Sequence, residues 1–315
     1  FRDRLAGHAD CLGDLALIHR RLSLGDLDEH TELRRGPFVI EDVDHTRPLG
    51  STVYKPLRLE GRYRVAGPLA PASRQRFVRR DPPFGMEFRP RDRAVYLPDS
   101  GTLVCADLHV GRDATSDVEL RLGEHEDLTT RFSALVDRYD PSAVVLAGDL
   151  LHTFDRVPTG AADTVRTFEE IAEDAGCRIV VTPGNHDTML EELWDGPIVP
   201  EFRLDGTSIV VTHGHVPPAA DAEWYVVGHD HPTIEIEGVR RPCYLHGTAQ
   251  YEGANVLMLP SFSRLPAGVR INQMTAASFQ SPFVTDVGTL RPIVYDPKSG
   301  ETHTFPPLAE LRQYL

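Results

Sequence analysis

The 315-residue sequence lacks several features that would assign a class of protein at once. No apolar run approaches the roughly 18 residues that a membrane-spanning helix needs, and no signal-peptide pattern follows a basic start. The four cysteines form neither a CxxC pair nor a disulfide-dense pattern; they are Cys11, Cys105, Cys177 and Cys243. We therefore expect a cytoplasmic protein with reduced thiols, no membrane segment and no thiol chemistry.

Lysine is almost absent. Of the 33 Lys+Arg residues only Lys55 and Lys298 are lysines, and the formal net charge is −14. Residues 1–85 carry 15 Lys+Arg against 12 Asp+Glu, so residues 86–315 carry the whole excess of acid. This composition is typical of a GC-rich genome and a salt-adapted cytoplasm, as in a halophilic archaeon. Because the Debye length is about 3 Å in 1 M salt, the net charge does not exclude a polyanionic substrate.

The character of the sequence changes at Met86, its first methionine. Before it, clusters of Pro, Gly and Arg at 34–37, 68–71 and 79–83 interrupt any helical or strand period. We interpret residues 1–85 as a poorly ordered or appended segment, with a small β-rich accessory domain as the alternative. Residues 86–315 are interpreted as the principal domain.

After Met86, short β-branched runs alternate with longer amphipathic segments, as βαβ units require. Strands are predicted at 102–106, 143–147, 179–181, 208–211 and 225–227, and helices at 124–139 and 162–176. Shorter β-like runs follow at 233–236, 242–246, 255–259 and 291–295. The pattern predicts an α/β fold in which two packed sheets are flanked by helices.

Oxygen and imidazole donors follow each of the first five predicted strands. In chain order the segments are Asp107-Leu108-His109, Gly148-Asp149, Gly184-Asn185-His186-Asp187, His213-Gly214-His215 and Gly228-His229-Asp230-His231. Open α/β sheets place ligands at the carboxyl ends of their strands, so we expect these segments to converge. Asp107 and His109 are two residues apart and would point the same way in an extended chain. Taken alone, each Asp or His has an ordinary structural explanation, but five in order make coincidence an unattractive account.

The number of candidate donors favours two metal ions over one. The seven candidates are Asp107, His109, Asp149, Asn185, His213, His229 and His231. One ion seldom takes more than six ligands, and Asp149 is the natural bridge. Two ions roughly 3.5 to 4 Å apart would hold a hydroxide nucleophile and neutralise a phosphoryl group during in-line attack. A donor set without thiolate suits two divalent ions, with Mn²⁺ expected first and Fe, Zn or Ni as alternatives.

In this order the five segments resemble the calcineurin-like metallophosphoesterase superfamily over roughly residues 95–275. The resemblance implies that residues 86–315 form a metallophosphoesterase domain, a four-layer α/β/β/α sandwich of two packed mixed sheets. It implies one ion bound by Asp107, His109, Asp149 and His231, and another by Asp149, Asn185, His213 and His229. It also implies that His186 acts on the substrate as an acid or as a transition-state donor.

Further motifs indicate which branch of the superfamily the sequence resembles. The block from Gly148 to His152 is similar to that of SbcD-type DNA repair nucleases, which implies that His152 supports His186. The segments 228–232, 259–262 and 268–272 look most like archaeal SbcD-related putative phosphoesterases and bacterial ligase-associated phosphoesterases. The Asp-Arg-Gly of protein serine/threonine phosphatases is absent. The roles of His152 and His215, as hydrogen-bonding support or local packing, stay open on the residues alone.

We therefore expect a metal-dependent phosphoric ester hydrolase, acting as a phosphodiesterase or nuclease. Its substrates would be nucleic acid or nucleotide diesters, with single-stranded DNA or RNA among the candidates. The alternatives are a small-molecule phosphomonoesterase and a non-catalytic protein-binding scaffold on the same fold. The complete ligand set with His186 disfavours the scaffold. The sequence identifies neither a protein partner nor the physiological substrate.

Overall fold

The computed structural model describes residues 85–113, 123–153 and 155–315. The interpretation of residues 1–85 therefore falls, apart from Gly85, outside the described residues, as does Cys11. The other three cysteines are buried and form no disulfide. Across the described part of the chain, no helix combines the length and the apolar composition that crossing a membrane requires.

The first sheet has five strands in the order β1-β2-β3-β4-β5. They are β1 (Arg89–Arg91), β2 (Ala94–Leu97), β3 (Thr102–Ala106), β4 (Ala143–Ala147) and β5 (Arg178–Thr182). Strands β3, β4 and β5 are parallel, and the β1–β2 hairpin runs antiparallel along β3. Every residue of β3 and β4 is buried, which explains why their sequences are continuous apolar runs.

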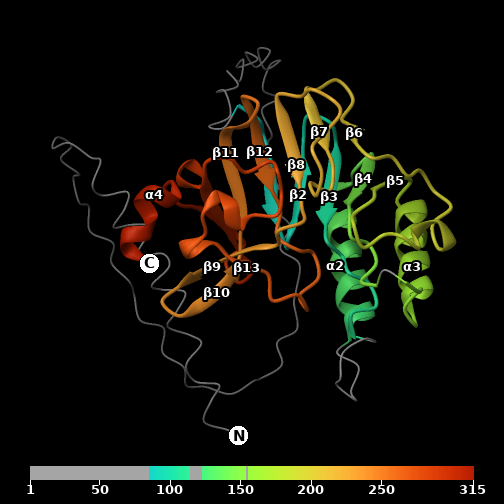
Figure 1. Cartoon of the computed structure of the whole chain (residues 1–315). Helices are drawn as coiled ribbons and strands as arrows, with labels where there is room; N and C mark the ends of the chain where they lie inside the picture. Colours follow the sequence, from blue (N-terminus) through green and yellow to red (C-terminus); the bar gives the residue numbers. More distant parts are fainter. Residues whose placement is uncertain (1–84, 114–122, 154) are drawn as a thin grey trace, which may run out of the picture. The chain divides into compact units, whose positions relative to one another are not determined.

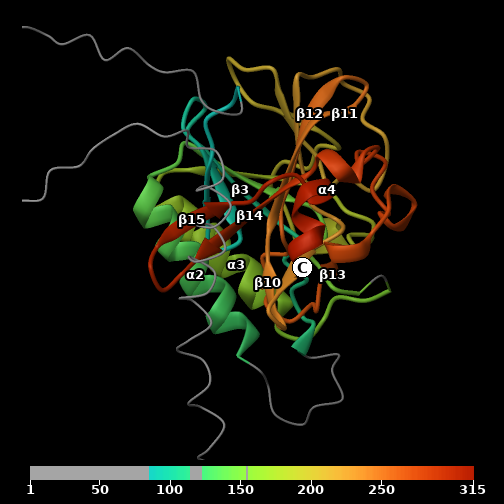
Figure 2. The same ribbon diagram turned by 90° about the vertical axis from the view of Figure 1, so that its left-hand side faces the viewer.

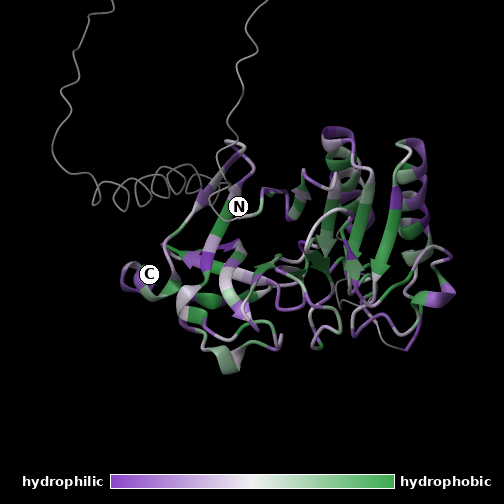
Figure 3. Cartoon of the chain, turned by 90° about the horizontal axis from the view of Figure 1, so that it is seen from above, coloured by the Kyte–Doolittle hydropathy of each residue, from purple (hydrophilic) through white to green (hydrophobic). Residues whose placement is uncertain are grey.

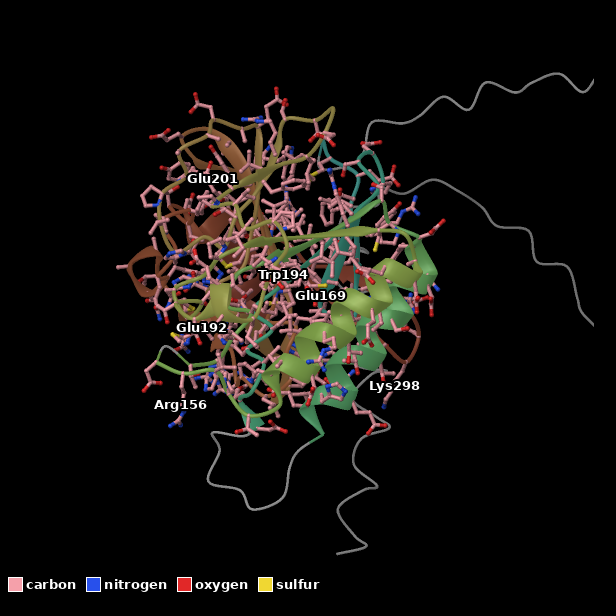
Figure 4. The ribbon with its side chains drawn as sticks, turned by 90° about the vertical axis from the view of Figure 1, so that its right-hand side faces the viewer. Arg156, Glu169, Glu192, Trp194, Glu201 and Lys298 are labelled. Carbon is pink, nitrogen blue, oxygen red and sulfur yellow. The ribbon has the colours of Figure 1, made fainter. Side chains whose placement is uncertain are left out.

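Two helices cover one face of this sheet, α2 (Glu124–Tyr139) and α3 (Ala161–Asp174) (Figure 1). Apolar residues of α2 recur every three or four positions and face the sheet, as an amphipathic helix requires. The rings of Phe132 in α2 and Phe168 in α3 lie 4.7 Å apart. Trp194 packs into the same core beside α3 (Figure 4). The helix predicted at 124–139 is thus confirmed at both ends.

The second sheet has seven strands in the order β15-β14-β11-β12-β8-β7-β6. They are β6 (Phe202–Arg203), β7 (Ile209–Val211), β8 (Trp224–Val227), β11 (Tyr244–Tyr251), β12 (Ala254–Met258), β14 (Arg291–Asp296) and β15 (Glu301–Thr304). Strands β7, β8 and β12 are parallel and the other pairs are antiparallel. Both sheets are therefore mixed.

The two sheets pack face to face around an apolar core. Val104 and Val145 of the first sheet share this core with Val226 and Leu257 of the second. Hydrophobic residues follow the strands in Figure 3, while the helices carry hydrophilic residues on their outer turns. The buried hydroxyl of Tyr244 donates a hydrogen bond of 2.7 Å to the carbonyl oxygen of Ala94, across the two sheets. The predicted α/β architecture of two packed mixed sheets is confirmed.

The layer on the far face of the second sheet contains short elements (Figures 1 and 2). It comprises a small sheet of β10-β9-β13, with β9 (Pro232–Ile236), β10 (Val239–Pro242) and β13 (Val269–Arg270). The α-helix of this layer, α4 (Leu308–Leu311), has four residues. Five 3-10 turns complete the described helical elements: η4 (Leu190–Glu192), η5 (Ile271–Gln273), η6 (Ala276–Ser278), η7 (Val287–Thr289) and η8 (Arg312–Tyr314).

One predicted strand, 242–246, is wrong as a single element. Strand β10 ends at Pro242 in the small sheet, and β11 begins at Tyr244 in the second sheet. The chain passes from one sheet to the other at Cys243, which is fully buried. The run of residues 242–246 does not reveal such a passage, because no turn residue other than Pro242 marks the change of sheet.

Candidate metal centre

The candidate donors lie where strands of the two sheets end. Asp107 follows β3 and Asp149 follows β4 in the first sheet, while His213 follows β7 in the second. The loops after β3 and β4 continue side by side, because the N–H of Asp107 donates to the Gly148 carbonyl at 3.0 Å and the N–H of His109 donates to that of Asp149 at 2.8 Å. The predicted convergence at the carboxyl ends of the strands is present.

The first group of donors consists of Asp107, His109, Asp149 and His231, whose ligand atoms all lie within 4.8 Å of one another. His231 Nε2 is 3.1 Å from His109 Nε2 and 3.1 Å from Asp107 Oδ1. His109 Nε2 is 4.0 Å from Asp149 Oδ2. Imidazole nitrogens and carboxylate oxygens thus point at one small volume, as the ligands of a single ion do.

The second group contains Asp149, His213 and His229, again within 4.8 Å of one another. His229 Nδ1 is 3.1 Å from His213 Nε2, which lies 3.6 Å from Asp149 Oδ1. Asn185 Oδ1 is 3.3 Å from His213 Nε2, so the amide oxygen joins this group. Asp149 belongs to both groups. The structure therefore brings together all seven predicted donors, with one carboxylate between the two halves.

The backbone at five of these donors is left-handed. The φ angles of Asp107, His109, Asp149, His229 and His231 lie between 46° and 74°. The expectation that Asp107 and His109 converge through an extended chain is therefore wrong: their side chains meet because the backbone turns sharply at both residues. Such conformations cost about 1–3 kcal/mol each and concentrate at functional sites, where the surrounding structure holds them in place.

Two glycines allow the strand ends to approach this closely. A Cβ atom on Gly148 would lie 2.2 Å from Nδ1 of His213, and one on Gly184 would lie 2.2 Å from Oδ1 of Asp149. Both distances are far below van der Waals contact, so any side chain there would displace a candidate ligand. The glycines of the sequence motifs are explained by this proximity.

Burial keeps three of the histidines neutral. It lowers the pKa of His109 to about 3, and it lowers the pKa of His213 and that of His229 to about 4. At neutral pH their rings therefore carry a lone pair, which metal coordination requires. The donor set of neutral imidazole, carboxylate and amide fits a first-row divalent ion.

The pKa values of the two carboxyl groups, Asp149 and Asp107, are shifted in opposite directions. Burial, reinforced by the neighbouring charge of Asp107, raises the pKa of Asp149 to about 8. Burial also acts to raise the pKa of Asp107, but the adjacent His231 and other histidines outweigh it, and the net pKa is lowered. Two desolvated carboxylates this close repel each other when both are ionised. Cations placed between them would remove that repulsion, so the residues fit a site for divalent ions.

His186 lies at the edge of both groups, with its side chain 22% exposed. Its N–H donates to Asp149 Oδ1 at 2.9 Å, and its Nε2 is 3.9 Å from Asp149 Oδ2. Nδ1 lies 2.9 Å from the carbonyl oxygen of His152, so Nδ1 carries a proton and donates it there. The rings of His152 and His186 stack, 6.0 Å apart and 11° from parallel. His152 thus contacts His186 through its backbone and its ring face.

Two aspartates of the motifs hold the backbone around the candidate donors, a role that the sequence analysis did not assign to them. Asp187 accepts hydrogen bonds from the N–H groups of Leu151 and Gly184 at 2.9 and 2.8 Å, which fixes the turn that carries Asn185. Asp230 similarly accepts from the N–H groups of residues 280 and 281 at 2.9 and 3.0 Å. Both aspartates stand inside the motifs and could have been assigned this role.

One support carries no sequence signal. The Ser261 hydroxyl donates to the carbonyl oxygen of Asp107 at 2.7 Å across a separation of 154 residues. No spacing rule predicts this contact, because it depends on how distant loops meet. His215, whose role the sequence left open, packs against His213 of the same segment, with ring centroids 5.1 Å apart.

Comparison with known proteins adds a family match. Residues 102–233 match the family model described as calcineurin-like phosphoesterase, a span that runs from β3 into β9 and includes every candidate donor. The match supports the superfamily and, with the clustered Asp and His residues, divalent metal binding and phosphoester hydrolysis. No curated protein matches the chain. Among solved structures the chain is similar to the Pseudomonas putida nuclease MPE, with 22% identity, a TM-score of 0.48, and coverage of 67% of this chain and 92% of that one.

Proposed function

We propose that this chain is a two-metal phosphodiesterase that cleaves nucleic acid or nucleotide-like diesters, with Mn²⁺ as the preferred ion. The observation that carries the proposal is the position of Asp149. Its carboxylate belongs to both donor groups, and His186 lies beside it. We assign Asp107, His109, Asp149 and His231 to one ion, and Asp149, Asn185, His213 and His229 to the other.

The metal ions and His186 would have separate tasks. When bound, the two ions supply water activation and neutralise the charge of a phosphoryl group. His186 completes neither donor group, and its partly exposed ring places Nε2 beside them. Because Nδ1 already carries the proton that it donates to the His152 carbonyl, donation from Nε2 to a non-bridging oxygen or to the leaving oxygen would use the imidazolium form, protonated at both nitrogens. The Nδ1 contact holds the ring in place.

A preference for diesters is supported by a missing motif. Protein serine/threonine phosphatases of the resembled superfamily carry an Asp-Arg-Gly after this aspartate, whereas the residues after Asp149 here, Leu150-Leu151-His152-Thr153, include no arginine. An arginine that would clamp a dianionic monoester is therefore absent at that place. A phosphodiester carries one negative charge fewer than a dianionic monoester and needs less cationic help. The similarity of the 148–152 block to a DNA repair nuclease motif supports the same choice.

The test is a panel of substrates with matched leaving groups, assayed with Mn²⁺ at near-neutral pH. We expect kcat/KM for an aryl phosphodiester to exceed that for the corresponding monoester, and slow cleavage of short single-stranded DNA or RNA. Asp149→Asn serves as the inactive control. A tenfold preference for the monoester without oligonucleotide cleavage would identify a monoesterase. Fewer than one bound ion and no activation by Mn²⁺ would identify a scaffold.

A further inference from the structure

An arginine-lined cavity adjoins the candidate metal centre. His231 forms part of its wall, and this inner portion has a volume of about 200 Å³. A second cavity of about 360 Å³ shares much of the same lining and extends away from His231. Both portions are lined by four arginines, Arg93, Arg240, Arg241 and Arg264. We call this combined space the arginine cavity.

The positive charge of the arginine cavity contrasts with the rest of the domain, which has a large excess of acid. The carboxylate in its lining, Asp92, lies 3.6 Å from Arg91, which is outside the cavity. Asp127, just behind the wall, pairs with both Arg131 and Arg264, at 2.7 and 2.9 Å. The acidic groups are thus engaged, and the cavity keeps an excess of guanidinium charge.

The four arginines have different roles. Arg93 donates from Nη1 to the carbonyl oxygens of Ser261 and Ser263, both at 2.9 Å. Burial and the nearby charges of Arg131 and Arg264 lower the pKa of Arg93 to about 10, which leaves it charged at pH 7. Arg93 therefore holds the loop whose Ser261 hydroxyl supports Asp107, and it links the cavity to the metal centre.

Arg240 and Arg241 are consecutive residues in the middle of β10. Arg240 donates to the Thr233 hydroxyl at 2.9 Å and to the Gly268 carbonyl at 3.3 Å, both of them neutral acceptors. Arg241 Nε is buried and has no hydrogen-bond partner in the part of the chain that the structure describes. The cavity is lined by Arg241, whose other guanidinium N–H groups can donate to an anionic ligand. Arg264 is 56% exposed and has further donors available beyond its pair with Asp127.

We propose that the arginine cavity binds backbone phosphates of an oligonucleotide next to the phosphodiester held at the metal centre. The proposal rests on the proposed function, since it extends that substrate beyond the scissile phosphate. Guanidinium groups match phosphate oxygens with two parallel hydrogen bonds. Pro242 and Pro260 line both portions beside the arginines. A small monoester has no second phosphate that could use this cavity.

The binding experiment uses the full chain with metal removed by chelation, so that no cleavage occurs. Fluorescence anisotropy measures the Kd of a labelled single-stranded DNA 12-mer at several salt concentrations. We expect Arg241→Ala combined with Arg264→Ala to raise the Kd by about tenfold. The slope of log K against log salt should become shallower by about 0.7 for each phosphate that the double variant no longer binds. Arg241→Lys, which keeps the charge, should weaken binding less.

Arg270→Ala is the matched control, because Arg270 lies on β13 of the same small sheet and pairs with Glu235 at 3.1 Å outside the arginine cavity. Circular dichroism and Tm would verify that each variant is folded. In the Mn²⁺-loaded chain, the double variant should raise KM for the 12-mer and leave kcat/KM for a small aryl diester within about twofold.

The outcomes separate this proposal from the proposed function. If the wild-type chain binds the 12-mer through these arginines but hydrolyses no diester, the role of the arginine cavity is supported and the proposed phosphodiesterase activity is contradicted. If the wild-type chain cleaves oligonucleotides but the double variant binds the 12-mer as tightly as Arg270→Ala does, the phosphodiesterase activity is supported and the role of the arginine cavity is contradicted. Absence of measurable 12-mer binding by the wild-type chain also overturns it.

Discussion

The backbone N–H of His229 lies 3.1 Å from Oδ1 and 3.0 Å from Oδ2 of Asp107, so it donates to the whole carboxylate. Asp107 follows β3 of the first sheet and His229 follows β8 of the second. A candidate ligand of one ion therefore orients the backbone of a candidate ligand of the other. The two halves of the centre are coupled before any ion binds, and substitutions in one half should be felt in the other.

Asp149→Asn tests the shared carboxylate. The amide keeps the size of the side chain but removes the negative charge that both donor groups use. We expect loss of at least one bound ion, measured by elemental analysis, and a fall in kcat on the order of 10³-fold. Asp163→Asn, at an exposed residue on α3, is the control and should change neither quantity. Full metal content with substantial turnover in Asp149→Asn would remove it from the bridging position.

His186→Ala separates chemistry from metal binding. Because His186 completes neither donor group, the variant should keep both ions. Its kcat should fall by about 10²- to 10⁴-fold, the range typical of general acid catalysis. The loss should be larger for a poor alkoxide leaving group than for an activated phenolate. Equal losses for both leaving groups would instead indicate a purely electrostatic contribution. His303→Ala on the edge strand β15 provides the comparison.

The raised pKa of Asp149 predicts proton release on metal binding. With a pKa of about 8 the metal-free carboxyl is mostly protonated at pH 7, and it must ionise to bind. His109, His213 and His229, with pKa values of about 3 to 4, are already neutral and release nothing. His231 adds to this release, because burial acts to lower its pKa but Asp107 outweighs burial and raises the pKa above the ordinary value of 6.5. Calorimetry in buffers of different ionisation enthalpy should show release of more than one proton at pH 7, decreasing toward pH 9. Absence of proton release at pH 7 would mean that Asp149 is already ionised in the metal-free protein.

The raised pKa of Asp149 also determines whether the metal-free protein gains or loses stability as the pH rises. In the metal-free protein the pKa of Asp149 lies above its ordinary value of 3.8, so the folded state holds the proton more tightly. The stabilisation by the neutral carboxyl is complete below pH 3.8 and is lost as the pH rises through about 8. Asp149→Asn, which is neutral at every pH, should therefore remove a fall in the free energy of unfolding between about pH 4 and pH 8. Urea denaturation of the chelated proteins would measure it.

Gly148→Ala tests the close approach of the strand ends. The added Cβ would overlap the His213 ring, so we expect the second donor group to lose its ion and activity to fall at least 10²-fold. Gly206→Ala is the control, because Gly206 has a similar φ of 71° but open space around it. That variant should cost only the strain of a left-handed alanine, about 1–2 kcal/mol of unfolding free energy, and keep its metal.

The sequence predicted the strands that are covered on both faces. Runs such as 102–106 and 143–147 are continuous because helices cover one face of the sheet and the second sheet covers the other. The hairpin β1–β2 was not predicted, since it spans few residues and turns at Asp92 and Arg93, two non-glycine residues with positive φ. Short edge strands have no period long enough to recognise.

For the candidate centre, the strand-end pattern predicted which seven side chains meet but not how the backbone delivers them. The left-handed turns at Asp107 and His109 depend on packing between loops, because the enrichment of Asp and His in this conformation is too weak to predict it at a given position. The arginine cavity is less predictable still. Arg93, Arg241 and Arg264 are separated by up to 171 positions in the chain, and only the meeting of β10 with the 260–264 loop brings them to one wall. Ion assignments and catalytic roles remain predictions for the experiments above.

Each donor group draws on both sheets, so each ion would act as a removable cross-link. In the first donor group, His231 from the second sheet joins three donors from the first sheet. In the second donor group, His213 and His229 from the second sheet join Asp149 and Asn185 from the first sheet. By mass action, the free energy of unfolding then rises with the concentration of free metal. In a cell with little free metal, the protein would be less stable as well as inactive. Metal supply would thereby set the lifetime of the protein together with its activity.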